Sequence, residues 1–403
     1  MKLTISRLKN PVQEYAWGSR TAISRLLGEP CPSASPQAEL WIGAHPKAPS
    51  LVRREERWIP LPDWIEAAPQ AILGDQVAKR FSNELPFLLK VLAAEKPLSI
   101  QAHPNLEQAR AGYALENLMG IPLDAAHRNY RDDNHKPELI CALTPFWALM
   151  GFRGVEQIAG LVEAIHNPQL TEVSRCLHDD SRASALQRFF SALMEMDRER
   201  QRRLVPGVMR CIDQISDNET IFHWMRELNR NYPADIGVLS PLFLNLIRLQ
   251  PGEALYIPAG VLHSYLHGVG IELMANSDNV LRGGLTPKHV DVAELAKSLH
   301  FKEVPADPVA PKMISPQESC YFTPAEEFIL SVIRLDRQHS YESRQKGSVE
   351  ILMCTEGQAR ISGSDDGEVV DLSQGGCVIV PGALSHYSLV GQGTLFKASV
   401  PLP

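Results

Sequence analysis

The sequence lacks a long hydrophobic run, an excess of positive charge and the pattern of a signal peptide in its first residues. In 403 residues the most apolar short stretch, residues 85–94, is interrupted by Lys90 and is too short to span a membrane. Lys and Arg number 40 against 47 Asp and Glu, so the net charge is −7 and a generally basic surface for nucleic acid or anionic membranes is excluded. The first residues contain no apolar core followed by a small-residue cleavage site, so we expect no leader.

Paired cysteines are also lacking. The seven cysteines are odd in number, scattered and without a C-x-x-C pair, which is typical of reduced thiols in a cytoplasmic protein rather than of a disulfide framework. Hydrophobic residues make up 44% of the chain and charged residues 22%, the balance of a globular protein. The length predicts two or three domains.

The distribution of patterns along the chain divides it into β-rich and helical parts. Short apolar runs between turn-forming residues predict strands at 41–43, 98–100, 139–142, 245–249, 254–257, 329–333, 349–353 and 377–380. Apolar spacing of three and four predicts helices at 155–165 and 183–194 and a third around 208–215, and residues 105–119 also look helical. The pattern predicts a mainly β protein with a helical insertion. Its expected units are residues 1–152 with 241–303, residues 153–240, and residues 304–403.

A weak internal repeat supports two related β units. Gly252, Pro258 and His263 recur with the same spacing as Gly375, Pro381 and His386, an offset of 375 − 252 = 123 residues. Both copies place an apolar strand between the glycine and the proline. We therefore expect two related barrels or double sheets.

Potential metal ligands lie around the predicted strands of the first unit. Gln101 and His103, at i and i+2, would share one face of a strand, and Glu138 and His263 follow further along. Imidazole and carboxylate are ligands that zinc takes readily. A single histidine is more often a satisfied polar residue than a ligand, so spacing alone makes the set only moderately specific. The second copy has no such upstream residues, and we expect His386 to be structural and the C-terminal unit to hold no metal.

Longer matches point to a known family. The segment from Gly252 to His263 resembles the second cupin motif, although His267 stands where that motif usually has Asn. More specifically, the chain resembles type I mannose-6-phosphate isomerase (phosphomannose isomerase). The resemblance rests on residues 13–18 (QEYAWG), 39–46 (ELWIGAHP), 98–104 (LSIQAHP), 133–138 (DNHKPE) and 276–288 (NSDNVLRGGLTPK).

This resemblance implies two cupin-like (jelly-roll) β units, a helical insertion, and one zinc ion held by Gln101, His103, Glu138 and His263. It also implies the interconversion of mannose 6-phosphate and fructose 6-phosphate, with the family's active-site arginine at Arg282. A phosphosugar is then the small-molecule substrate, and we expect a monomer with no nucleic-acid or membrane partner.

Such an isomerisation moves a proton between C1 and C2 through an enediolate, and several residues could serve it. Lys136 lies two residues before Glu138 and could be the proton shuttle, because a cation beside it favours the neutral amine. Glu272 lies in an apolar strand, where a carboxylate is costly unless it is paired or faces a pocket. We rank these two nearly level as the base. His135 could assist opening of the sugar ring, and a structural role is equally compatible.

Other residues are candidates for binding the substrate. For the phosphate they are Ser99, Lys90 and Lys288, since a lone lysine in an apolar strand is expensive unless it faces a cavity or an edge. Trp17, Tyr265 and His45 are candidates for lining the sugar site. Each of these could instead be an ordinary core or surface residue.

Two other classes of function remain open at this point. A cupin oxygenase with non-haem iron would use His103, Glu138 and His263 as two histidines and a carboxylate, but it would not need Gln101 or Arg282. A non-catalytic sugar-binding cupin would not need Lys136 beside the metal. Both alternatives leave more of these residues unexplained than the isomerase does.

Overall fold

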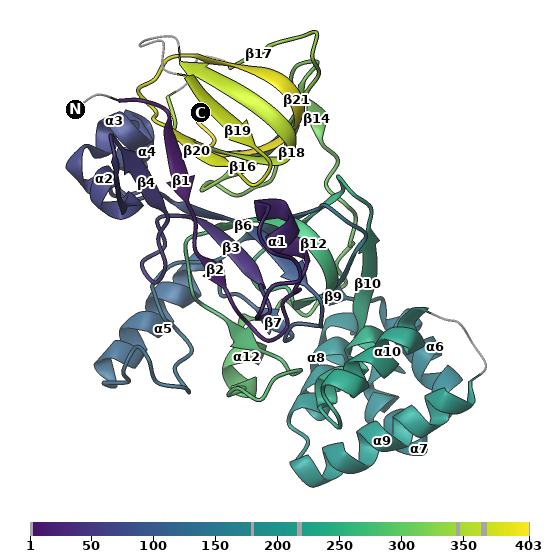
Figure 1. Cartoon of the computed structure of the whole chain (residues 1–403). Helices are drawn as coiled ribbons and strands as arrows, with labels where there is room; N and C mark the ends of the chain where they lie inside the picture. Colours follow the sequence, from purple (N-terminus) through teal and green to yellow (C-terminus); the bar gives the residue numbers. More distant parts are fainter. Residues whose placement is uncertain (1–2, 179–180, 216–219, 344–346, 364–368, 403) are drawn as a thin grey trace.

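The computed structural model describes residues 3–178, 181–215, 220–343, 347–363 and 369–402. The strands of these residues form two sheets, and a block of helices projects from one of them (Figure 1). The prediction of a mainly β protein with a helical insertion is therefore confirmed. No helix within the described ranges has both the length and the apolar character needed to cross a membrane.

The first sheet, which we call the site sheet, runs in the order β10-β9-β12-β6-β3-β2, with four further strands attached to it. Its members are β2 (Val12–Gln13), β3 (Glu39–Gly43), β6 (Phe87–Ala94), β7 (Gln101–Ala102), β8 (Glu138–Ala142), β9 (Phe146–Phe152), β10 (Leu244–Leu249), β11 (Ala254–Ile257), β12 (His263–Ala275) and β13 (Leu281–Arg282).

Strand β12 organises the site sheet. It pairs with β6 and β8 over its second half and with β7 and β9 at its beginning, so one long strand reaches every part of the site. Strand β6 is buried along its whole length, as expected of an apolar strand with neighbours on both sides. The single lysine in that strand, Lys90, lies opposite Glu272 of β12 in the register.

The second sheet, the C-terminal sheet, has the order β14-β15-β16-β21-β18-β20-β1-β4-β5. Its members are β1 (Ser6–Lys9), β4 (Leu51–Arg54), β5 (Arg57–Pro60), β14 (Lys312–Met313), β15 (Glu318–Tyr321), β16 (Ile329–Leu335), β17 (Tyr341–Glu342), β18 (Glu350–Gly363), β19 (Val369–Ser373), β20 (Cys377–Val380) and β21 (Tyr387–Ser399). Strands β1, β4 and β5 come from the N-terminal part of the chain, and β1 pairs with β20. The expected division of the chain at residue 304 stays a proposal.

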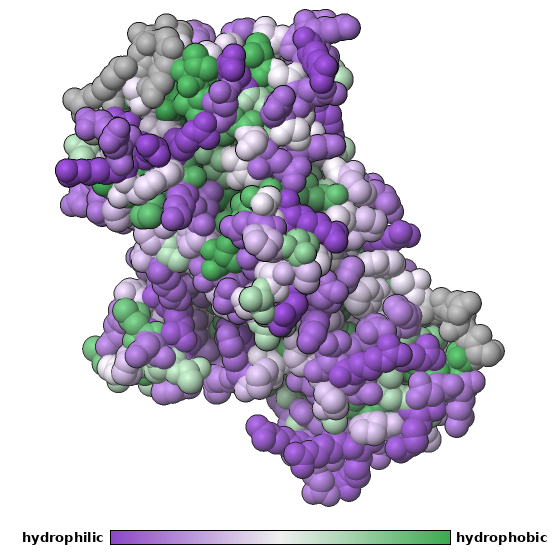
Figure 2. Space-filling view, in the orientation of Figure 1, coloured by the Kyte–Doolittle hydropathy of each residue, from purple (hydrophilic) through white to green (hydrophobic). Residues whose placement is uncertain are grey.

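The helical insertion packs as an amphipathic bundle. It comprises α6 (Val155–Ile165), α7 (Pro168–Val173), η1 (Ser174–His178), α8 (Arg182–Met194), α9 (Arg198–Gln214), α10 (Thr220–Asn231), η2 (Ile236–Leu239) and α11 (Ser240–Phe243). Their apolar faces share one core with residues of β7, β9 and β12, so the insertion is packed onto the site sheet. Its outer face in this view is mostly hydrophilic (Figure 2).

The remaining helices are α1 (Ala22–Leu27), α2 (Leu61–Ala67), α3 (Pro69–Leu73), α4 (Asp75–Arg80), α5 (Leu106–Leu118) and α12 (Val292–Ser298). Helix α5 begins with a reciprocal capping box between Asn105 and Gln108, which explains why the helix predicted at 105–119 forms there. Most predicted helices and strands are confirmed with small shifts of their ends, but β18 continues to Gly363 and α9 begins already at Arg198. One predicted strand is wrong. Residues 98–100 are not a strand; β7 covers only Gln101–Ala102, so His103 lies beyond it.

Candidate active site

A cavity of about 590 Å³ opens over the site sheet and contains most of the residues selected from the sequence. Its lining takes in all six candidates for substrate binding, which are Ser99, Lys90, Lys288, Trp17, Tyr265 and His45. Gln101, Lys136, Glu138, Glu272 and Arg282 line it as well. Segments separated by up to about two thirds of the chain, from Trp17 to Lys288, therefore meet at one cavity.

Two histidines and a carboxylate meet beside the cavity, and of the three Glu138 lines it. His103, Glu138 and His263 each offer one ligand atom, and these atoms lie within 4.8 Å of one another. All three residues are buried, with exposed fractions of 1%, 1% and 0%. Within the described part of the chain this is the one group of three or more such side chains close enough to share a metal ion.

The polar atoms of this group lack the hydrogen bonds that buried atoms normally make. Nε2 of His103, Nε2 of His263 and Oε2 of Glu138 have no hydrogen-bond partner among the described residues. Each imidazole nitrogen lies 3.3 Å from a carboxylate oxygen of Glu138. Leaving such atoms unpaired costs about 1–3 kcal/mol each, which a metal ion bound between them removes. The donor set of two imidazoles and a carboxylate suits a divalent cation such as zinc.

The other nitrogens of the two histidines set their orientation. Nδ1 of His103 lies 2.7 Å from the carbonyl oxygen of Asn279, and Nδ1 of His263 lies 3.1 Å from that of Val261. A proton on each Nδ1 donates to the carbonyl and leaves Nε2 free as a metal ligand. Metal-binding histidines usually make such a hydrogen bond with their other ring nitrogen. Burial lowers the pKa of His103 to about 4, so its ring is neutral at pH 7.

Gln101, the fourth ligand implied by the resemblance, lies beside this group. It is opposite His263 in the pairing of β7 with β12 and opposite Arg282 in the pairing with β13. Directly opposed residues of an antiparallel pair point their side chains to the same face. The register therefore brings Gln101 next to His263 although 162 positions separate them, 263 − 101.

Lys136 and Glu138 form an ion pair at the edge of the metal group. Nζ of Lys136 lies 2.8 Å from Oε1 of Glu138, and both side chains are almost fully buried. Burial alone would raise the pKa of Glu138, but the charge of Lys136 and the contacts with His103 hold that pKa well below its usual range. Glu138 is therefore a carboxylate at neutral pH, as a metal ligand must be.

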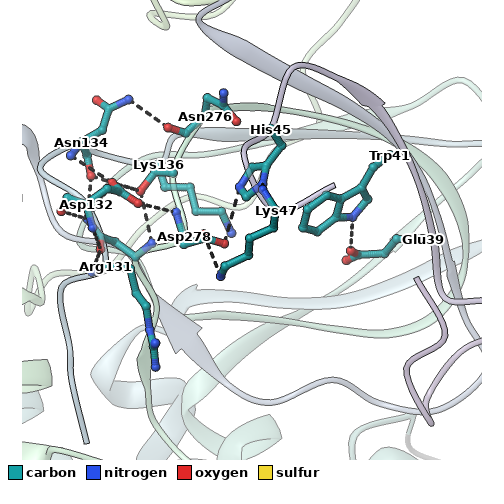
Figure 3. Close-up of polar contacts among 12 residues, drawn as sticks. Glu39, Trp41, His45, Lys47, Arg131, Asp132, Asn134, Lys136, Asn276 and Asp278 are labelled. Atoms are coloured by element: carbon teal, nitrogen blue, oxygen red, sulfur yellow. Dashed lines mark hydrogen bonds and ion pairs between the residues drawn. The ribbon is translucent and has the colours of Figure 1, made fainter. Parts of the chain in front are cut away.

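A second charge group, which includes Lys90 of β6, also lines the cavity. Nζ of Lys90 is 2.9 Å from Oε2 of Glu272 and 3.8 Å from Oε1 of Glu39. Glu39 in turn accepts a hydrogen bond from Nε1 of Trp41 at 2.6 Å (Figure 3). Burial alone would lower the pKa of Lys90, but these carboxylates raise it, so Lys90 stays charged. Its charge is already balanced inside the protein by two carboxylates.

Positive charge also gathers in the cavity, where Lys47, Arg282 and Lys288 line it. Burial and the neighbouring Arg131 lower the pKa of Arg282, and burial together with Arg282, Arg131 and Lys47 lowers that of Lys288. Arg282 and Lys288 both line the cavity and repel each other, which favours an anion beside them. Arg131 lies close to both but donates to the carbonyls of Leu123 and Ala125. The sequence reasoning selected Arg282 and Lys288 but missed Arg131 and Lys47. Arg131 lies two residues before the recognised 133–138 segment, and that position was the available signal.

Asp278 was also missed, and it connects two sides of the cavity. Its carboxylate lies 2.8 Å from Nζ of Lys47 and 3.6 Å from Nε2 of His45 (Figure 3). Burial alone would raise the pKa of Asp278, but contacts with His45 and Lys47 hold it well below its usual range. It stands inside the recognised 276–288 segment, so the motif itself was its signal.

His135 is the predicted catalytic residue that the structure keeps apart from the others. It does not line the cavity, and its Nε2 lies 2.6 Å from Oε1 of Glu327, which precedes β16 of the C-terminal sheet. In an extended chain, neighbouring side chains point in opposite directions. Lys136 therefore reaches the metal group and His135 does not.

The fold and the His–Glu–His group define a mainly β protein with a buried metal-binding centre beside a cavity lined in part by cations. Comparison with known families then identifies it further. Residues 5–155 match the model of the phosphomannose isomerase type I catalytic domain, and residues 155–244 match that of its helical insertion domain. The chain belongs to the type I phosphomannose isomerase family of enzymes.

Individual relatives agree with this assignment. The mannose-6-phosphate isomerase of Escherichia coli K12 is 41% identical over 98% of this chain and 99% of its own, and that of Bos taurus is 35% identical over 94% and 93%. A variant of the Salmonella typhimurium phosphomannose isomerase superposes with a TM-score of 0.91 at 38% identity, covering 99% of this chain and all of its own. A solved mannose 6-phosphate isomerase with bound zinc superposes with a TM-score of 0.89 and the same coverage.

Proposed function

We propose that this chain is a zinc-dependent aldose–ketose isomerase that interconverts mannose 6-phosphate and fructose 6-phosphate. One observation carries the proposal: three buried ligand atoms without partners among the described residues lie beside a cavity that is also lined by cations. The zinc-bound relative and the names of the curated relatives support the same metal and substrate.

His103, Glu138, His263 and Gln101 would hold the zinc ion. When bound there, zinc acts as a Lewis acid toward oxygen atoms of the substrate. His103 and His263 are held for this role by the carbonyls of Asn279 and Val261, and Glu138 brings the only negative charge of the set. The centre stays net positive, as polarising a hydroxyl or carbonyl oxygen requires.

Arg282 and Lys288, with Arg131 beside them, would bind the phosphate. Guanidinium groups bind oxyanions through two parallel hydrogen bonds, and the mutual repulsion of these cations is relieved by a dianion. Lys90 was a further candidate, but its charge is already shared between Glu272 and Glu39. Ser99 lines the cavity next to Gln101 and could add a hydroxyl donor. Trp17, Tyr265 and His45 would line the sugar chain.

Lys136 would move the proton between C1 and C2 through an enediolate. It lines the cavity and contacts Glu138, so it lies at the boundary between the metal group and the substrate. Glu272 is the second candidate, although it is engaged by Lys90. Arg282 would stabilise the negative oxygen that develops, a contribution of about 3–4 kcal/mol for a well-placed donor. His135 would act, if at all, on ring opening.

We also propose that the enzyme is a cytoplasmic monomer with the three units expected from its sequence. All seven cysteines are free thiols, which suits a reducing compartment. Sedimentation of the purified chain at several concentrations tests the monomer, because a dimer would double the mass.

A coupled assay for fructose 6-phosphate tests the proposed reaction. With mannose 6-phosphate as substrate, we expect turnover that a chelator abolishes and that one equivalent of zinc restores. Turnover that survives complete removal of the metal would disprove the metal-dependent mechanism. Iron-dependent uptake of oxygen would favour the cupin oxygenase, and tight sugar binding without turnover would favour the non-catalytic cupin.

A further inference from the structure

The loop that carries the proposed phosphate ligands contains a strained residue. Leu285 is fully buried yet has φ = 55°, in the left-handed region that a bulky side chain rarely adopts. Such a residue costs about 1–3 kcal/mol and persists only where its surroundings hold it. Leu285 lies between Arg282 and Lys288, so its conformation decides how the loop places the two cations.

The contacts that hold Leu285 come from the helical insertion. Oδ1 of Asp235 accepts hydrogen bonds from the backbone N–H of Leu285 at 2.9 Å and of Gly237 at 2.8 Å, and Oδ2 accepts one from that of Thr286 at 3.4 Å. Asp235 is also the N-cap of η2. One half-buried carboxylate therefore ties the start of η2 to the loop.

The two turns fit against each other so closely that each needs a glycine. A Cβ atom at Gly237 would lie 2.9 Å from both N and Cγ of Leu285. A Cβ atom at Gly284, where φ is +118°, would lie 3.0 Å from Oδ1 of Asp235 and 3.1 Å from Cα of Gly237. The insertion thus supports the loop through close backbone packing as well as through the Asp235 carboxylate.

The same loop is fastened on its other side to the metal group. The N–H of Ile100 donates to the carbonyl of Gly284 at 3.1 Å, and the N–H of Gly283 donates to that of Ile100 at 2.8 Å. Ile100 directly precedes Gln101. The loop is therefore held between the segment that leads to the metal group and the turn of the insertion that contains Asp235.

We propose that Asp235 is a positioning residue through which the helical insertion holds the Arg282–Lys288 loop in its phosphate-binding conformation. The inference rests on the proposed function, in which Arg282 and Lys288 bind the substrate phosphate. The helical insertion would thus have a structural role in substrate binding. The Asp235 carboxylate compensates the strain at Leu285, so that Arg282 and Lys288 are already in place when the phosphate dianion binds.

Asp235→Ala and Asp235→Asn test this role in the full-length zinc enzyme. For Asp235→Ala we expect the KM for mannose 6-phosphate and the inhibition constant of inorganic phosphate to rise together by roughly tenfold, as for loss of one hydrogen bond to a charged group. We expect kcat to fall as well, by roughly the same factor, because the loop also places Arg282, the proposed stabiliser of the developing negative oxygen. Zinc content should stay the same, because the metal group is not touched. Asp235→Asn keeps one accepting oxygen, so its increases should be smaller.

Asp213→Asn is the matched control, because Asp213 lies on the same insertion, is exposed and pairs with Arg226 away from the loop. It should leave both constants unchanged. Gly237→Ala, which pushes on Leu285 without removing the carboxylate, should raise them as Asp235→Ala does. Unchanged constants in a folded Asp235→Ala enzyme, or a loss of stability and kcat with an unchanged KM, would overturn the inference. A wild-type enzyme that does not isomerise mannose 6-phosphate would instead refute the proposed function.

Discussion

Nε2 of His135 lies 2.6 Å from Oε1 of Glu327, so the segment leading into β8 is tied directly to the C-terminal sheet. Glu138, the first residue of β8, is only three positions further along. The C-terminal sheet thereby contacts the peptide that carries a proposed metal ligand, although it contributes no residue to the metal group itself.

Glu327→Gln should weaken this connection in a pH-dependent way. Burial alone would raise the pKa of Glu327, but the contact with His135 lowers it. A carboxyl whose pKa is lowered by folding stabilises the protein above its unfolded pKa of about 4.3, and this contribution is lost as the pH falls through the folded value.

Thermal melts should therefore show a lower melting temperature for Glu327→Gln than for the wild type at pH 6, with a gap that closes below about pH 4. The neighbouring Glu326→Gln is the control, because the Glu326 side chain is 71% exposed and pairs only at the surface with Arg80. A gap that persists at pH 3 would mean that the ion pair is not its cause.

His263→Ala should remove the metal, and His386→Ala should not. His386 occupies the equivalent position of the repeat, where its Nδ1 lies 3.3 Å from the carbonyl oxygen of Ser343. Elemental analysis should show the zinc content of the His263 variant falling to near zero. Its activity should fall by more than about 10–100-fold, which is the typical loss when a hydrogen-bond partner of a metal ligand is removed. Equal zinc content in the two variants would remove His263 from the ligand set.

Lys136→Met and Glu272→Gln should separate the two candidates for proton transfer. If Lys136 is the base, its variant lowers exchange of solvent protons into the substrate by about 10²–10⁴-fold, the usual contribution of a general base. Glu272→Gln should lower it less, and its effect should resemble that of Lys90→Met because the two form one ion pair. If neither variant lowers exchange, both assignments are wrong.

Asn279→Ala should weaken zinc binding without touching a ligand. The side-chain amide of Asn279 donates to the backbone carbonyls of Asp132 and Asn134, and its Oδ1 accepts from the N–H of Arg131. The backbone carbonyl of Asn279 contacts Nδ1 of His103. Losing this support should reduce zinc affinity by about 10–100-fold, measured by competition with a chelator.

Asn245→Ala is the comparison for Asn279→Ala. Its amide also donates to several carbonyls, among them those of Met150 and Val304, but it has no contact with the metal group. It should lower stability and leave zinc affinity unchanged. An equal loss of affinity in both variants would show that general destabilisation is responsible.

Much of the local structure follows from the sequence alone. The helix at 155–165 has the predicted ends, and most predicted strands lie inside observed ones. These elements are determined by the spacing of apolar residues and by turn-forming neighbours, which act over a few positions. The choice of His103, Glu138 and His263 also came from the chain, and the structure brings these three side chains together.

Other features depend on contacts between distant segments. The sequence does not reveal that β1, β4 and β5 join the C-terminal sheet, because pairing depends on which edge strands meet in the folded chain. It does not reveal that Lys90 is shared by Glu272 and Glu39, or that Asp235 supports Leu285 across 50 positions. The chemical groups were thus determined locally by residue type. Their partners, and with them their charges and orientations, were decided only by the tertiary structure, because burial and neighbouring charge are properties of the assembled fold.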